Sequence, residues 1–333
     1  GIAITYSLSF IIKDFFAASG VLLPFGYGQG TGQAMNYGNI YETQFGFVGG
    51  KSFGLTIAAL GFISAGIGGV IYLNILRKKG VVKMSEEEVT EAINSEQIQN
   101  PDEVPMNASI DKLTIQIAII AVSYVIVYII MAVLGKVVGE GLKATIYGFN
   151  FLFGVIAASL VKAVLSFLEK KNIVRKKYVN PFLMKRLSNF FFDIMIIAGV
   201  AAIRLEMIKK YWWVLLILGT VGAVSTYFYN LFVARKLFPE YSDEQFLVMY
   251  GMLTGTASTG VILLREKDVD FSTPAMDNLV YQNLPAIVFG FPMMLLATFA
   301  PKNTWMTLII LVLFFAVMNV LLFRSFIFRR KNK

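Results

Sequence analysis

Long apolar runs follow one another along this chain, and no other feature constrains its fold as strongly. A helix needs about 20 apolar residues to cross the roughly 30 Å hydrocarbon core of a bilayer. Such runs predict spans at 1–12, 50–76, 113–135, 144–168, 188–205, 211–234, 278–299 and 304–323. The first run is too short to cross alone. The sequence therefore predicts an all-α polytopic membrane protein.

The composition agrees with this interpretation and excludes several classes of protein. The 333 residues are 56% hydrophobic and 15% charged, whereas a soluble domain is about 45–50% apolar and about 25% charged. Cysteine and histidine are absent, which excludes disulfides, thiolate sites and the most common general base. We attribute the net charge of +9 to basic cytoplasmic loops and expect no nucleic-acid partner.

Positive charge is concentrated in three polar segments, which the positive-inside rule places in the cytoplasm. They are the linker 77–112, the 169–186 loop with its seven Lys and Arg residues, and the tail 324–333. The connections 136–143 and 300–303 carry few cations and are predicted to lie outside.

Two apolar segments, 14–45 and 243–272, are interrupted by glycine and polar residues. The first contains FGYGQGTGQAMNYG and the second contains YGMLTGTASTGVILLRE. In the predicted topology each segment begins and ends on one side, and the two enter from opposite faces. Discontinuous segments at matching positions of inverted halves mark the substrate site of a secondary transporter. We therefore predict an inverted repeat, with 1–76 as the C-terminal part of the first copy and 113–333 as the second.

Polar groups at the two breaks are the candidate ligands. Glycine permits unusual backbone dihedrals, freed carbonyls suit Na⁺, and helix N-termini suit a carboxylate. The candidate substrate-binding residues are Gln29, Gly30, Thr31, Gly32, Gln33, Asn36, Thr254, Gly255, Thr256, Ser258, Thr259 and Arg265. The candidate Na⁺ ligands are Thr31, Thr256, Ser258 and Asp193.

Three charged residues in or beside the spans can also be explained without a role in binding. Asp193 is as well explained as an interfacial acid near a helix start, where the helix dipole favours a negative charge. Arg265 is as well explained as a cytoplasmic anchor. Lys162 is expected to extend its amine toward the lipid surface.

Other functions explain the glycine-rich stretch less well. A nucleotide-binding loop needs a βαβ context and a following Lys, and neither is present. A potassium-channel filter needs four equivalent loops, but the second broken segment has no GYG. The sequence has neither the paired intramembrane aspartates nor the G-x-S-x-G motif that a membrane hydrolase would need. Close helix packing through glycine alone leaves the amides and hydroxyls of the stretch unexplained.

Two stretches resemble the bacterial sodium/glutamate symporters. GYGQGTGQAMNYGNIYETQFGF followed by GLTIAALGFISAGIGGVI is similar to the first signature of that family, and GTASTGVILLREKDVDFSTPAMDNLVY is similar to its inverted copy. Three features differ from the family. Gln29 stands where members often have His, and the chain ends with one span more than the inverted pair requires. Spans 113–135, 144–168 and 188–205 have no counterparts before Gly1, as if an N-terminal part were lacking.

The resemblance implies Na⁺-coupled uptake of glutamate or a related acidic amino acid. It further implies a homodimer in the bacterial inner membrane, surrounded by lipid, and an elevator-like movement of the broken segments. No enzymatic activity is expected, and no cofactor other than Na⁺ as the coupling ion. A cation channel and a transporter of another organic anion, such as a dicarboxylate, remain the alternatives.

Overall fold

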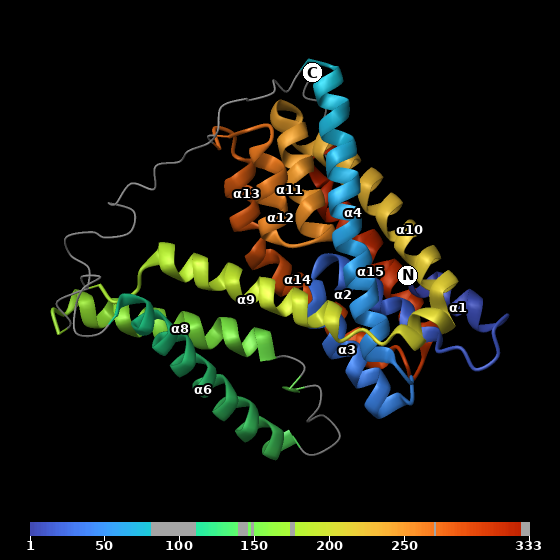
Figure 1. Cartoon of the computed structure of the whole chain (residues 1–333), viewed down its shortest axis with the longest axis horizontal. Helices are drawn as coiled ribbons and strands as arrows, with labels where there is room; N and C mark the ends of the chain where they lie inside the picture. The colour runs from blue at the N-terminus through green and yellow to red at the C-terminus, as the bar shows by residue number, and fades with distance from the viewer. Residues whose placement is uncertain (81–110, 139–145, 148–149, 174–176, 270, 328–333) are drawn as a thin grey trace. The chain divides into compact units, whose positions relative to one another are not determined.

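The computed structural model describes residues 1–80, 111–138, 146–147, 150–173, 177–269 and 271–327, and its regular elements in these ranges are all helical (Figure 1). The α-helices are α1 (Ile2–Ser9), α2 (Leu22–Gly28), α3 (Gly30–Phe45), α4 (Gly50–Lys78), α6 (Lys112–Val138), α8 (Asn150–Lys170), α9 (Pro181–Ala201), α10 (Leu205–Leu237), α11 (Ser242–Thr254), α12 (Ala257–Arg265), α13 (Ala275–Tyr281), α14 (Asn283–Phe299), α15 (Thr304–Leu322) and α16 (Arg324–Ile327). Two 3₁₀ helices, η1 (Ala17–Val21) and η2 (Pro239–Tyr241), complete the set.

Five of these helices, namely α4, α6, α8, α10 and α15, are long and apolar enough to cross a membrane. The predicted all-α polytopic membrane protein is thereby confirmed. Four predicted spans, 50–76, 113–135, 211–234 and 304–323, coincide with α4, α6, α10 and α15 to within a few residues. The fifth, 144–168, begins among residues that are not described and continues as α8.

Two predicted spans differ from the observed helices. Residues 278–299 are interrupted at Gln282, between α13 and α14, because Pro285 lacks the amide hydrogen that would bond to the carbonyl of Tyr281. Residues 188–205 fall on α9, whose 21 residues include Lys185, Arg186 and Asp193. These charges keep α9 out of the set of apolar spanning helices.

The chain divides into two compact units by its internal contacts, a division that does not test the predicted repeats. One unit takes residues 1–84 and 195–333, and the other takes 85–194. The predicted second copy, 113–333, is thus shared between them. Most of the predicted linker 77–112 lies outside the described residues.

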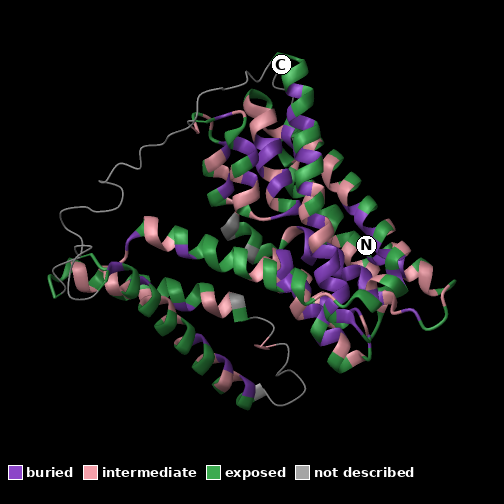
Figure 2. Cartoon of the chain, in the orientation of Figure 1, coloured by how far each residue is buried: buried purple, intermediate pink, exposed green. Residues whose placement is uncertain are grey.

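The larger unit is organised around α4, which packs against α2, α3, α10 and α11 (Figure 1). One apolar cluster of this unit joins the second half of α4 to α11, with Tyr72, Leu73 and Leu76 against Phe246 and Tyr250. Figure 2 shows the buried residues gathered along these helices. A largely apolar helix suits this position, because α4 packs against four helices on one side, while Ile63, Ile67 and Val70 on the other side stay exposed.

Both predicted breaks are present in this unit. In the first segment α2 ends at Gly28 and α3 begins at Gly30, with Gln29 between them. In the second, α11 ends at Thr254 and α12 begins at Ala257, and the two helices pack against each other. Entry of the two segments from opposite faces of the membrane stays a prediction.

The smaller unit contains α6, α8 and the first part of α9. Its apolar contact is formed by Val127 and Met131 of α6 and Ala157 of α8. The side chain of Gln116 fastens the segment before α9 to α6, because its amide donates to the Tyr178 carbonyl at 2.7 Å and its oxygen accepts from the Asn180 amide at 3.1 Å. This anchoring holds the end of the basic loop 169–186 against α6.

The predicted sidedness gives a direct labelling test. Because the chain has no cysteine of its own, Lys177→Cys and Lys302→Cys each introduce a single reactive thiol. We expect an impermeant maleimide to label Lys302→Cys in intact cells and to label Lys177→Cys only after the membrane is opened. Labelling of Lys177→Cys from outside would contradict the assigned topology.

Candidate functional site

The two breaks are brought together at Gly61 of α4. A methyl group at Gly61 would lie 2.7 Å from the carbonyl oxygen of Thr254 and 3.5 Å from that of Gly26. The same methyl would lie 3.3 Å from the ring of Tyr27. Only glycine therefore allows α4 to approach the ends of α2 and α11 together. The helices α2 and α11 also touch each other directly.

Two tyrosines fix this arrangement on α4, one from each broken segment. The hydroxyl of Tyr27 donates to the Gly219 carbonyl of α10 at 2.7 Å and lies 3.0 Å from Ser64 Oγ. The hydroxyl of Tyr250 donates to the Ser64 carbonyl at 2.9 Å. Both broken segments thus bond to the same residue of α4, one turn beyond Gly61.

The first break depends on the left-handed backbone of Gly30, whose φ is +75°. This conformation costs a residue with a Cβ about 1–2 kcal/mol. No atom lies within 4 Å of the position that a Cβ at Gly30 would take, so the constraint is in the backbone and not in the packing. The helix α3 starts here without a side-chain cap at Gln29. Its first amide groups therefore carry the partial positive charge of a helix N-terminus.

Thr31 and Gln33 place unpaired oxygens in the first turn of α3. The two residues are only 2% and 8% exposed. Neither Thr31 Oγ1 nor Gln33 Oε1 has a hydrogen-bond partner among the described residues. A buried polar atom without a partner costs about 1–3 kcal/mol, and such atoms call for an explanation. Hydroxyl and amide oxygens are suitable ligands for a hard cation such as Na⁺.

The end of α9 that belongs to the larger unit closes one side of this turn. A methyl group at Gly199 would lie 3.4 Å from Cγ2 of Thr31, and a methyl group at Gly32 would lie 3.2 Å from the sulfur of Met195. The methyl side of Thr31 is therefore packed against protein. These contacts explain the burial of Thr31 without giving its hydroxyl a partner.

At the second break, by contrast, hydroxyl groups are engaged in holding the backbone. Thr254 Oγ1 donates to the Tyr250 carbonyl at 2.6 Å. Thr256 caps α12 in a capping box with Thr259, in which each backbone amide donates to the other side-chain oxygen at 3.4 Å. Such a cap stabilises the helix end by about 1 kcal/mol. Half-buried Ser258 follows in the first turn of α12.

The remaining candidates lie in other environments. Gln29 is exposed and Asn36 is half-buried, almost two turns into α3. Arg265 ends α12, about 12 Å along the axis from Ala257, with its guanidinium 5.3 Å from the Phe271 ring centre. The structure therefore does not bring Arg265 to the second break.

Asp193, the candidate Na⁺ ligand on α9, belongs to the smaller unit and is exposed. The described residues contain no group of three or more His, Cys, Asp or Glu that could hold a metal ion.

Ion pairs close the base of the α11–α12 hairpin. The Lys267 ammonium lies 2.9 Å from a carboxylate oxygen of Asp243 and 3.1 Å from one of Glu244. The hydroxyl of Tyr72 of α4 donates to the same Asp243 carboxylate at 2.6 Å. The two arms of the hairpin are thus joined to each other and to α4 at the end away from the break.

Asp268 organises the loop that follows the hairpin. Its carboxylate accepts hydrogen bonds from the backbone amides and the hydroxyls of both Ser272 and Thr273, at 2.6–2.9 Å. Burial alone raises the pKa of this carboxyl, but the hydrogen bonds outweigh it and the net pKa is below the usual value. Asp268 therefore has a structural role.

Sequence reasoning missed the residues that join the two breaks. Tyr27 and Tyr250 lie inside the broken segments but were not singled out, because a tyrosine in an apolar run has no distinctive local signal. Gly61 and Ser64 belong to ALGFISAG, a series of small residues at helical spacing. That spacing indicates close helix contact but does not identify the neighbour.

Comparison with known proteins adds one match. Residues 18–255 match the family described as sodium/glutamate symporter, a region that includes the first break, α4 and α11 and ends at Gly255 within the second break. No curated protein and no solved structure matches the chain significantly.

Proposed function

Because the chain belongs to the sodium/glutamate symporter family, we propose that it uses the Na⁺ gradient to take up glutamate or a related acidic amino acid at the paired breaks. The observation that carries this proposal is the pair of buried, unpartnered oxygens on Thr31 and Gln33 in the first turn of α3, directly after the first break. The protein is a multi-pass membrane protein. We assign it to the bacterial cytoplasmic membrane and expect a homodimer there.

Na⁺ binding is assigned to the first turn of α3. Thr31 Oγ1 and Gln33 Oε1 supply two uncharged oxygens, and a bound cation relieves the cost of burying them without partners. Backbone carbonyls freed at the breaks are the natural source of further ligands. The bound charge then makes the site more favourable for an anion, which is the electrostatic basis of coupling.

The substrate carboxylate is assigned to the N-terminus of α3. The amide groups there point toward the break and favour negative charge, together with the backbone of Gly30 and Gly32. The half-buried hydroxyls of Thr256, Ser258 and Thr259 lie at the other break and supply weaker polar contacts. We retain Thr256 and Ser258 as candidate Na⁺ ligands as well, although the Thr256 oxygen also accepts the Thr259 amide.

Which acid is transported is tested by competition between substrates. A small, donor-rich site accepts several dicarboxylates, and citrate or aspartate needs the same groups as glutamate. We expect unlabelled glutamate to compete with labelled glutamate at a lower concentration than citrate does. A stronger effect of citrate would identify the protein as a transporter of another organic anion.

Replacing the unpaired oxygens separates a ligand role from a packing role. Thr31→Val and Gln33→Met keep the side-chain size and remove the oxygen. Removal of a buried, unsatisfied polar atom is neutral or stabilising for the fold, so the melting temperature without Na⁺ should stay equal or rise. Loss of a ligand to a charged group costs about 1.5–3 kcal/mol. The Na⁺ concentration for half-maximal uptake should therefore rise about 10-fold to 100-fold.

Thr43→Val is the matched control on the same helix. Its hydroxyl is exposed and already donates to the Asn39 carbonyl at 2.8 Å. We expect this variant to keep the wild-type Na⁺ dependence. If Thr31→Val and Gln33→Met kept it too, the unpaired oxygens would not bind the coupling ion.

A further inference from the structure

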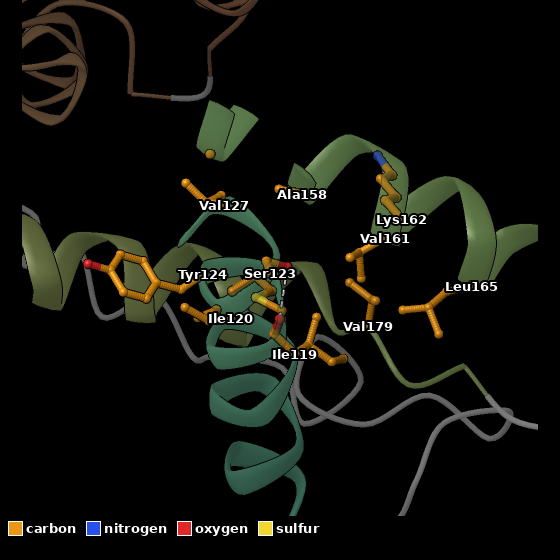
Figure 3. A pocket seen from close by; sticks show the side chains of 12 residues that line it. Ile119, Ile120, Ser123, Tyr124, Val127, Ala158, Val161, Lys162, Leu165 and Val179 are labelled. Carbon is orange, nitrogen blue, oxygen red and sulfur yellow. Dashed lines mark hydrogen bonds between the residues drawn. The ribbon is translucent and has the colours of Figure 1, made fainter. Parts of the chain in front are cut away.

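A cavity of about 390 Å³ lies within the smaller unit, between α6, α8 and the start of α9. Figure 3 shows Ile119, Ser123 and Val127 along α6 and Ala158, Val161 and Leu165 along α8 around it, with Lys162 at the edge of the group. The volume is within the roughly 300–1,000 Å³ range of small-molecule sites. The cavity is partly open to the surroundings of the two helices.

The walls of this groove are apolar apart from the hydroxyl groups of Ser123 and Tyr124 and one cation. Ser123 Oγ donates to the Ile119 carbonyl of its own helix at 2.9 Å, so its hydrogen is not available to a ligand. Lys162 is the charged residue among the described residues that line the groove. It is exposed and forms no ion pair with any of them or with other described residues. An amine inside an apolar span is stabilised by an anion or by reaching the interface.

The groove extends toward the basic end of the unit. Val179, which precedes α9, and Met184, in the first turn of α9, also line it, and both belong to the segment 169–186, whose sequence carries seven Lys and Arg residues. The Gln116 contacts described above hold this loop segment against α6. Basic pockets between spanning helices on the cytoplasmic side are typical binding sites of anionic lipid headgroups.

We propose that this groove binds an anionic phospholipid of the cytoplasmic leaflet. One acyl chain lies between α6 and α8, and Lys162 pairs with the phosphate. Charge complementarity selects this occupant, because an apolar helix of a protein partner would bury Lys162 without an opposite charge. Only 11% of the most apolar 18-residue stretch of α6 is buried within the chain, and only 6% of that of α8, so lipid has access to both helices.

The test measures lipid binding to the purified protein in detergent. Phosphatidylglycerol and phosphatidylcholine with identical acyl chains are added, and the bound lipid and the melting temperature are recorded. We expect phosphatidylglycerol to bind more tightly and to raise the melting temperature more. Lys162→Gln should weaken phosphatidylglycerol binding about five-fold, while Lys162→Arg should retain it.

Two further variants separate the groove from the general surface charge. Gly154 lines the groove, and nothing lies within 4 Å of a Cβ added there, so Gly154→Leu should fold and occupy the acyl-chain space. It should reduce binding of phosphatidylglycerol, whereas Val164→Leu, on an exposed part of α8 outside the groove, should not.

Lys170→Gln, at the end of α8, is the control for charge and should have less effect than Lys162→Gln. Equal binding of the two lipids would overturn the proposal. Equal losses in Lys162→Gln and Lys170→Gln, or full binding to Gly154→Leu, would overturn it as well.

Discussion

Gly30→Ala is expected to abolish transport while the protein still folds and reaches the membrane. The φ of +75° at Gly30 makes the change unfavourable by about 1–2 kcal/mol. The surrounding space is open, so the strain is relieved by turning the backbone and not by moving neighbouring helices. That rotation displaces the next residues, Thr31 and Gln33, whose oxygens are assigned to Na⁺. The measurements are the initial uptake rate per amount of membrane protein and the melting temperature.

Gly66→Ala on α4 is the matched control. Gly66 is exposed and helical, and a Cβ there meets no atom within 4 Å. Alanine in a helix interior is favoured over glycine by roughly 0.5–1 kcal/mol, so this variant should be as stable as wild type or more stable and should remain active. A wild-type rate for Gly30→Ala would remove the functional argument for the first break.

Gly61→Ala is expected to have an effect of similar size for a different reason. Its methyl group would overlap the Thr254 carbonyl oxygen at 2.7 Å and crowd the Tyr27 ring at 3.3 Å. Overpacking of this kind costs about 1–3 kcal/mol, and relief requires α4 to move away from both breaks. We therefore expect a lower melting temperature together with loss of Na⁺-dependent uptake.

The contrast between Gly61→Ala and Gly66→Ala is informative because both residues lie on α4, five positions apart. Gly61 faces the breaks, whereas Gly66 faces outward. If Gly61→Ala transported at the wild-type rate, close approach of α4 to the two breaks would not be needed for function. If both variants were equally impaired, the helix as a whole would be intolerant of added volume.

The parts of the fold with a strong local signal could be predicted from the sequence. Twenty or more apolar residues in a row define a spanning helix with little help from the rest of the chain, and α4 and α10 lie where the apolar runs predicted them. The breaks were also predictable, since glycine, threonine and glutamine in such a run oppose a continuous helix. A proline inside an apolar run, Pro285, was the local signal that would have divided 278–299.

The hydrogen bonds of the two tyrosines could not be predicted, because they depend on partners distant in the sequence. Tyr27 bonds to a carbonyl 192 positions away and Tyr250 to one 186 positions away. Thr31 and Thr256 look equivalent in the sequence, yet Thr256 caps a helix and Thr31 has no partner among the described residues. Thr256 finds its partner Thr259 three residues away, whereas the burial of Thr31 results from tertiary packing against Gly199 of α9.

The central claim is that the paired breaks couple the uptake of an acidic amino acid to the entry of Na⁺. It is tested most directly by measuring uptake driven by a Na⁺ gradient. The purified protein is reconstituted into vesicles, and labelled glutamate is followed with Na⁺ outside only, with equal Na⁺ on both sides, and with K⁺ in place of Na⁺. We predict accumulation above the external concentration only in the first condition, and its loss in Gly30→Ala. Equilibration at the same rate in all three conditions would indicate a passive channel and contradict the account.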